Sequence, residues 1–317
     1  MAEAAQRLPV LVLTGPTGTG KSDWAIALAG EAPVEIISVD SALVYRGLDI
    51  GTAKPSAAQR ERIPHHLIDI CDPAERYSAG RFVQDALQNI REVQGRGCVP
   101  LLAGGTMLYL RSLLTGIAPL PLAAPALRAE LDARAAREGW PALHRELARV
   151  DPVAAARIAP ADAQRIQRAL EVYLTTGEPI SQLQRATVSP LGAAPLALWG
   201  LAPAERSVLH ARLEQRFAAM MAAGFLEEVR QLHRRGDLTA LHPAMRAVGY
   251  RQLWAHLDGA YDLAEAVRRG VAATRQLAKR QLTWLRSMPG VEWVDPQQVP
   301  LVSWIRDTRA RLAPFGL

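Results

Sequence analysis

The residues Gly15-Pro-Thr-Gly-Thr-Gly-Lys-Ser22 restrict the fold more than any other part of the sequence, because they fit the P-loop pattern GxxxxGK[S/T] without a mismatch. The apolar run Pro9–Thr14 precedes them, and a helical pattern follows from Ser22 to Gly30. Glycines let consecutive N–H groups and the start of the helix surround phosphate oxygens. We therefore predict a diphosphate site formed by Gly15, Pro16, Thr17, Gly18, Thr19, Gly20 and Lys21, with the Ser22 hydroxyl as a ligand of Mg²⁺.

The first hundred residues alternate between apolar runs and helical patterns. Further strands are expected at Val34–Val39, His66–Ile70 and Val99–Ala103, and a helix at Ala79–Gln94. The runs are continuously apolar, which is typical of parallel strands covered by helices on both faces. The predicted fold class is therefore α/β, with a P-loop nucleotide-kinase-like core.

The alternation stops at a segment with Pro119, Pro121 and Pro125, and residues 126–176 are helical in pattern only. A second proline-rich segment precedes the apolar run Leu196–Leu201, after which helical patterns dominate. The simplest interpretation is an all-helical domain, residues 122–194, inserted into a discontinuous α/β core. That core spans residues 1–121 and 195–317 and ends in a helical C-terminal part.

Composition excludes several classes of protein. The 317 residues include only two cysteines, so a disulfide scaffold is not expected. No run of 18 apolar residues occurs, and Met1–Arg7 lacks the features of a signal peptide. The sequence therefore favours a cytoplasmic protein with no membrane contact.

Positive charge is concentrated in the last third. Residues 201–290 hold 14 Lys or Arg against eight Asp or Glu, an excess equal to the net charge of +6 for the whole chain. Such a surplus suits a polyanion; an arginine-rich proteome explains the charge equally well. Four cations share one face of the helix expected at Leu263–Arg286: Arg268, Arg275, Lys279 and Arg286. This face either follows an RNA backbone or is only solvated.

Two further groups follow predicted strands. Asp40 follows the expected strand Val34–Val39, and Gly104-Gly105-Thr106 follows the expected strand Val99–Ala103. Ligands bind at this edge of a parallel sheet, so Asp40 should face the reacting end of the diphosphate. The alternatives are that Asp40 contacts magnesium indirectly or caps a helix, and that Thr106 caps the helix Met107–Leu114.

Seven motifs, in order along the chain, resemble those of the bacterial tRNA dimethylallyltransferases, also called tRNA isopentenyltransferases or the IPP transferase family. They are GPTGTGKS at 15–22, DSALVYRGLDIGTAKP at 40–55, PHHLIDI at 64–70, YSAGRF at 77–82, GGTMLYL at 104–110, QRIQRALEV at 164–172 and RAVGYRQ at 246–252. The family usually has Cys where this chain has Ala247. The resemblance implies transfer of a dimethylallyl group from dimethylallyl diphosphate to N6 of the adenosine at tRNA position 37, next to the anticodon, with release of diphosphate.

The resemblance also implies roles for individual residues. Asp40 matches the general base, Thr106 a residue near the reacting carbon, and Arg216 an arginine for the diphosphate, although Arg216 suits a solvated helix face equally well. Residues that match tRNA-contacting positions are Asp40, Ser41, Ala42, Leu43, Thr106, Arg128, Gln164, Arg165, Ile166, Gln167, Arg168, Arg246, Ala247, Val248, Gly249, Tyr250 and Arg251. The implied cofactor is Mg²⁺ and the implied partner is the tRNA anticodon stem-loop, bound by a monomer.

Two other functions fit parts of the sequence. A P-loop small-molecule or nucleoside kinase accounts for the phosphate loop and a helical lid, but not for the motifs at 40–55 and 104–110. A non-catalytic RNA-binding module accounts for the basic charge but leaves the P-loop and Asp40 without a role.

Overall fold

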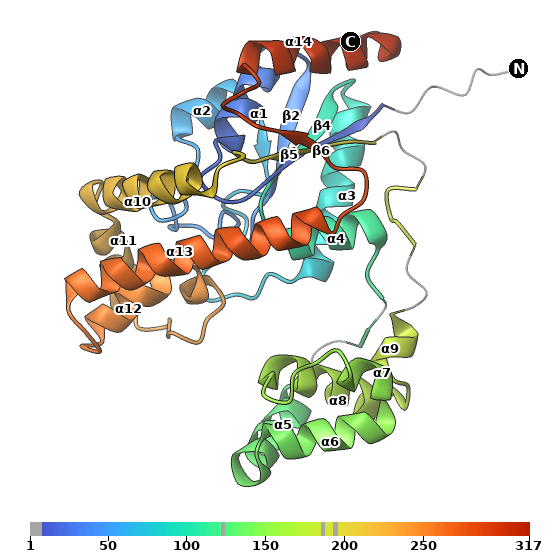
Figure 1. The fold of residues 1–317 in the computed structure, drawn as a ribbon, viewed down its shortest axis with the longest axis vertical. Coiled ribbons are helices and arrows are strands. Elements are labelled where there is room, and N and C mark those ends of the chain that lie inside the picture. Colours follow the sequence, from blue (N-terminus) through green and yellow to red (C-terminus); the bar gives the residue numbers. More distant parts are fainter. Residues whose placement is uncertain (1–7, 119, 122–123, 185–187, 193–195) are drawn as a thin grey trace, which may run out of the picture. The chain divides into compact units, whose positions relative to one another are not determined.

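A computed structural model describes residues 8–118, 120–121, 124–184, 188–192 and 196–317. Met1–Arg7 and Pro119 of the sequence-based interpretation, and the expected boundary residues 122, 194 and 195, lie outside the described residues. The chain divides into two compact units (Figure 1). Unit 1 comprises Met1–Leu113 and Leu191–Leu317, and unit 2 comprises Leu114–Pro190.

The centre of unit 1 is a six-stranded sheet in which every pairing is parallel, in the order β3-β2-β4-β1-β5-β6. Its strands are β1 (Val10–Thr14), β2 (Val34–Val39), β3 (His65–His66), β4 (Val99–Gly104), β5 (Leu196–Leu201) and β6 (Glu292–Val294). All residues of β1 and β2 are buried, because helices cover both faces of the sheet. The predicted α/β class is confirmed.

The helices of unit 1 include those that cover the sheet. They are α1 (Lys21–Ala29), α2 (Ala57–Arg62), α3 (Ala79–Gly95), α4 (Met107–Thr115, whose last two residues belong to unit 2), α10 (Arg206–Ala222), α11 (Phe225–Arg234), α12 (Tyr250–Leu257), α13 (Leu263–Arg286) and α14 (Leu301–Leu312), with 3₁₀ turns at Ala244–Arg246 and Ala313–Phe315. Trp24 of α1 and Trp304 of α14 pack on β1 and β5 in one apolar cluster. Helix α3 packs against β2 and β4.

Unit 2 consists of helices around an apolar core of its own. They are α5 (Pro125–Glu138), α6 (Trp140–Val150), α7 (Pro152–Ala155), α8 (Ala163–Thr176) and α9 (Ile180–Leu183). Leu131, Leu147 and Leu170 are among the buried residues of this core. The structure divides the chain at 113/114 and 190/191, whereas the boundaries expected from the sequence lie at 121/122 and 194/195.

One expected strand is wrong in extent. The sequence predicts a strand over His66–Ile70, but β3 ends at His66. Leu67 and Asp69 adopt positive φ angles of 61° and 58°, which a strand does not tolerate. Tertiary contacts hold this turn: the Asp69 N–H donates to the Leu43 carbonyl, and the Asp69 carboxylate pairs with Lys54 and Arg60.

Candidate functional site

The P-loop lies between β1 and α1, where the sequence predicts it. Gly15, Gly18 and Gly20 have φ angles of 150°, 82° and 88°, all in the region that favours glycine. A Cβ on Gly15 would lie 2.2 Å from the Leu201 carbonyl oxygen, and one on Gly18 would lie 2.6 Å from the Leu213 side chain. The loop is therefore closely packed against β5 and α10, and only glycine fits at these two positions.

Lys21 points back into the loop, where its Nζ donates to the Pro16 carbonyl at 2.6 Å. The Thr19 hydroxyl donates to the same oxygen at 3.0 Å. Burial, together with the nearby Arg216 charge, lowers the pKa of Lys21 to about 7, against the opposing effect of Asp40. A proton on this amine is therefore weakly held until an anion enters the loop.

A second part of the site follows β2 and β4 at the same edge of the sheet. The Asp40 Oδ1 accepts from the backbone N–H groups of Ala42 at 2.8 Å and Leu43 at 3.3 Å. Among the described residues, Oδ2 of Asp40 has no hydrogen-bond partner. The Thr106 Oγ1 accepts from the Ser41 N–H at 2.9 Å, so the turns after β2 and β4 are joined directly. Asp40 thus shapes its own turn and still offers one free carboxylate oxygen.

These groups meet at a cavity of about 490 Å³ in unit 1. Thr17, Asp40 and Thr106 line it from the edge of the sheet, while α10 and α13 contribute Arg216 and Arg280. Apolar side chains form much of the remaining wall: Leu108, Leu213, Phe217, Met220, Phe225 and Trp284. A polar end beside a P-loop and an apolar wall suit a ligand with a charged head and a hydrocarbon tail.

Arg216 reaches this cavity from α10. Its Nη2 donates to the Thr52 carbonyl at 3.2 Å, and it also lines a neighbouring cavity of about 610 Å³. Burial lowers the pKa of the Arg216 guanidinium, and Asp40 and Asp23 act in the opposite direction. Arg216 is therefore a partly buried cation beside the acid and the phosphate loop, rather than part of a solvated helix face.

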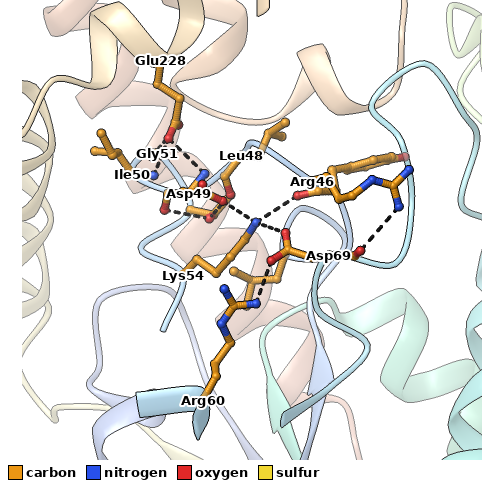
Figure 2. A network of polar contacts seen from close by, with 12 residues as sticks. Arg46, Leu48, Asp49, Ile50, Gly51, Lys54, Arg60, Asp69 and Glu228 are labelled. Carbon is orange, nitrogen blue, oxygen red and sulfur yellow. Dashed lines mark hydrogen bonds and ion pairs between the residues drawn. The ribbon is translucent and has the colours of Figure 1, made fainter. Parts of the chain in front are cut away.

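The segment from Asp40 to Pro55 is held by the buried Lys54 and by carboxylates that the sequence analysis did not identify (Figure 2). Lys54, whose side chain is 3% exposed, pairs with Asp49 and Asp69 and donates to the Tyr45 carbonyl at 3.0 Å. From α11, the Glu228 carboxylate accepts from the N–H groups of Asp49, Ile50 and Gly51 at 3.0, 2.6 and 3.1 Å. These contacts fix the turn that carries Gly51 and Thr52 into the cavity wall.

Residues 246–251 enter the same wall. Arg246, Ala247, Val248 and Tyr250 line the cavity. A Cβ on Gly249, whose φ is 91°, would lie 2.8 Å from the Phe225 ring. The Tyr250 hydroxyl donates to Glu228, and burial raises the pKa of this phenol above its usual value. Arg251 is exposed on α12. The structure therefore brings the motif at 246–252 together with Asp40 and Thr106.

The residues predicted to meet RNA in unit 2 have other partners. Arg128 and Arg168 both pair with Glu171, at 2.8 and 2.7 Å, and the Glu171 side chain is fully buried. Burial opposes ionisation of Glu171, yet hydrogen bonds from Arg128 and Arg168 lower its pKa to about 2.

Ile166 lies in the core of unit 2. Gln167 donates to Asp132 at 2.7 Å, and Arg165 pairs with Asp162 while its side chain remains 69% exposed. Gln164 is exposed.

The residues present fit a magnesium ion of the kind that P-loops hold. The Ser22 side chain is exposed beside Lys21 at the start of α1. Mg²⁺ is commonly held by one or two protein oxygens together with substrate phosphates and water. No group of three or more His, Cys, Asp or Glu among the described residues is placed to hold a metal. No helix in the described part of the chain is both long and apolar enough to cross a membrane.

Comparisons with known proteins agree with these features. A family model described as IPP transferase matches residues 43–288, and one described as isopentenyl transferase matches residues 8–69. The chain is 60% identical over 290 residues to the tRNA dimethylallyltransferase of Methylibium petroleiphilum, covering 90% of this chain and 89% of the relative. It is 60% identical over 291 residues to that of Alkalilimnicola ehrlichii, covering 92% of each.

Solved structures give the same result. The tRNA isopentenylpyrophosphate transferase of Bacillus halodurans matches with a TM-score of 0.71 and 36% identity, over 97% of this chain and 96% of that one. A eukaryotic dimethylallyltransferase acting on tRNA matches with a TM-score of 0.77 and 28% identity, over 96% of this chain and 77% of the other.

Proposed function

Since the chain belongs to the IPP transferase family, we propose that it transfers a dimethylallyl group from dimethylallyl diphosphate to N6 of the adenosine at position 37 of tRNA. The products are the prenylated tRNA and diphosphate. Family membership and the named relatives favour this tRNA dimethylallyltransferase activity over the kinase. The observation that carries the proposal is that Thr17 of the P-loop, Asp40 and an apolar wall line one cavity of unit 1.

The leaving group occupies the P-loop. As the bond between C1 and oxygen breaks, its electron pair goes to the diphosphate, where the negative charge grows. N–H groups of the loop, Lys21 and Arg216 stabilise that charge. The Ser22 hydroxyl would hold Mg²⁺ together with the diphosphate, and the ion would supply further charge neutralisation there. The dimethylallyl carbons then lie against the apolar wall, which includes Phe217 and Leu213.

The nucleophile approaches from the side of Asp40. N6 of adenine is a weak nucleophile, and it loses a proton as the new carbon–nitrogen bond forms. The free Oδ2 of Asp40 accepts that proton. Thr106, which accepts from the Ser41 N–H at 2.9 Å, holds the acid's turn against the glycine turn after β4. This arrangement supports Asp40 as the general base.

The tRNA anticodon stem-loop supplies the adenine. An adenine must leave the base stack to enter a cavity, and the unpaired bases around it are then available for hydrogen bonds and stacking. Asp40–Leu43 and Arg246–Arg251 are the tRNA-facing stretches proposed for unit 1. Exposed Gln164 and Arg165 are the corresponding groups in unit 2, where Arg128 and Arg168 stabilise the helices through Glu171. We expect the enzyme to act as a monomer in the cytoplasm, where its tRNA substrate is found.

A parallel incubation separates this function from its alternatives. We expect the protein to prenylate tRNA when given dimethylallyl diphosphate and Mg²⁺, with no requirement for ATP. Phosphate transfer from ATP without prenylated tRNA would instead indicate the kinase. Tight tRNA binding with no product in either tube would indicate an RNA-binding module. Mass spectrometry of tRNA nucleosides measures the outcome.

The cations on the outer face of α13 should contribute to RNA affinity. Lys279 and Arg286 line a cavity of about 550 Å³ with Arg206 and Arg275, whereas Arg268 pairs with Glu265 on its own helix. Affinity falls as salt rises, and each phosphate contact removed reduces the magnitude of the negative slope of log affinity against log salt by about 1. The K279A/R286A double variant should therefore bind tRNA more weakly, with a slope smaller by about 2.

Filter binding of tRNA at several salt concentrations measures this slope. The R306A/R309A double variant on α14 is the matched control, because it removes the same charge from a helix that lines neither this cavity of about 550 Å³ nor the reaction cavity. A slope for K279A/R286A equal to that of the control would show that this face of α13 is only solvated.

A further inference from the structure

A buried glutamine of α13 connects the two halves of the reaction cavity. The Gln281 Oε1 accepts from the Thr17 N–H at 2.9 Å, and its Nε2 donates to the Gly105 carbonyl at 2.8 Å. One amide therefore contacts both the P-loop after β1 and the glycine turn after β4. The chemistry of the two partners also fixes the orientation of the amide, since one is a donor and the other an acceptor.

On the P-loop side, Gln281 sets the orientation of a single peptide unit. The Thr17 N–H that donates to Gln281 belongs to the same planar peptide group as the Pro16 carbonyl. That carbonyl, on the opposite side of the peptide, accepts from Thr19 and from the Lys21 ammonium. Holding the N–H therefore determines where the carbonyl points, and with it the position of Lys21 before substrate binds.

On the other side, Gln281 orients a second peptide unit in the same way. The Gly105 carbonyl that it contacts shares a planar group with the Thr106 N–H. That N–H donates to the Val39 carbonyl at 3.0 Å, directly before Asp40. A Cβ on Gly105 would lie 2.6 Å from the Gln281 Nε2 and 3.1 Å from the Gly15 carbonyl oxygen, so glycine is needed for this close approach.

We propose that Gln281 is a positioning residue that sets the distance between the diphosphate loop and the turn carrying Asp40. The inference rests on the proposed function. Bond breaking at C1 and proton removal from N6 must occur in one geometry, and a displacement of about 1 Å can cost about 100-fold in rate. Gln281 itself lines the reaction cavity, and its proposed effect is exerted through the peptides at 16–17 and 105–106.

The first test replaces Gln281 by leucine, which is similar in size and lacks both hydrogen bonds. We expect kcat for prenyl transfer to fall about 100-fold, with tRNA affinity within about threefold of the unaltered protein, since the neighbouring cations of α13 remain. The matched control is Q276L, because Gln276 is exposed on the same helix. Thermal denaturation establishes that Q281L is folded.

The second test uses Q281E, which remains informative if Q281L does not fold. A protonated carboxyl accepts from the Thr17 N–H and donates to the Gly105 carbonyl as the amide does, whereas a carboxylate cannot donate. The ratio of kcat for Q281E to kcat for Q276E should therefore decrease as the pH rises. A glutamine that only fills space predicts no such dependence.

Prenyl transfer by the unaltered protein and by Q276L shows that the proposed function holds independently of this inference. The inference is overturned if Q281L keeps its kcat, or if its loss lies wholly in tRNA affinity, which would make Gln281 an RNA contact. A Q281E to Q276E ratio that does not change with pH would overturn it equally.

Discussion

Replacing Asp40 by asparagine should lower the turnover of prenyl transfer about 1000-fold and change tRNA affinity by less than about threefold. The Asp40 Oδ1 accepts two backbone N–H groups of its own turn, and the asparagine carbonyl can accept the same two bonds. The asparagine amide cannot, however, take a proton from N6. D40N therefore removes the general base and leaves the turn in place. Single-turnover rates with saturating tRNA and filter binding measure the two quantities.

D40A separates the two roles of this side chain further. It removes the acceptor for the N–H groups of Ala42 and Leu43 as well as the base, so it should lose tRNA affinity beyond the loss in D40N. If D40N lost turnover and tRNA affinity in equal proportion, Asp40 would be a binding residue and another group would have to accept the proton.

Replacing Lys21 by methionine should lower kcat/KM for dimethylallyl diphosphate about 100- to 1000-fold, the usual cost of removing one group that stabilises charge in a transition state. The effect should depend on pH. The pKa of Lys21 is about 7 in the free protein, so the amine is charged below this pH and neutral above it. Because the diphosphate binds the charged form, kcat/KM of the unaltered protein should fall as the pH rises above about 7.

K21R is the control for this pH dependence, since a guanidinium stays charged throughout the range. Steady-state kinetics at saturating tRNA should show the alkaline decrease in the unaltered protein, but not in K21R or K21M. An identical decrease in all three proteins would assign the titration to a different group.

Local patterns predicted most of the core. The P-loop, the strands at β1, β2, β4 and β5, and the helix at α13 follow from apolar periodicity and glycine spacing. Strand β6 has only three residues, too few for a pattern to emerge. Residues Leu67–Ile70 appear strand-like in composition, but the ion pairs of Asp69 with Lys54 and Arg60 hold them in a turn. No local rule describes such long-range contacts.

The candidate site was predictable where a motif carries it and not where partners lie far apart in the sequence. Thr17 and Gln281 are 264 residues apart, and Asp49 and Glu228 are 179 apart. One signal was present: Gln281 lies on the buried stripe of α13 with Ala278 and Leu285, and a polar residue on such a stripe needs hydrogen-bond partners. The i,i+3 spacing of Arg168 and Glu171 on α8 is a second local signal, whereas nothing comparable marks Arg128, 43 residues away, as a partner of Glu171.

The central claim is that the P-loop holds the departing diphosphate while Asp40 faces the acceptor nitrogen. A crystal structure with Mg²⁺, an anticodon stem-loop RNA and a thiolodiphosphate analogue of the donor, in which sulfur replaces the bridging oxygen and slows cleavage, tests it directly. The account predicts the diphosphate on the N–H groups of the P-loop beside Lys21, with N6 of the flipped adenine within hydrogen-bonding distance of Asp40. A diphosphate bound outside the P-loop, or an adenine turned away from Asp40, would contradict it.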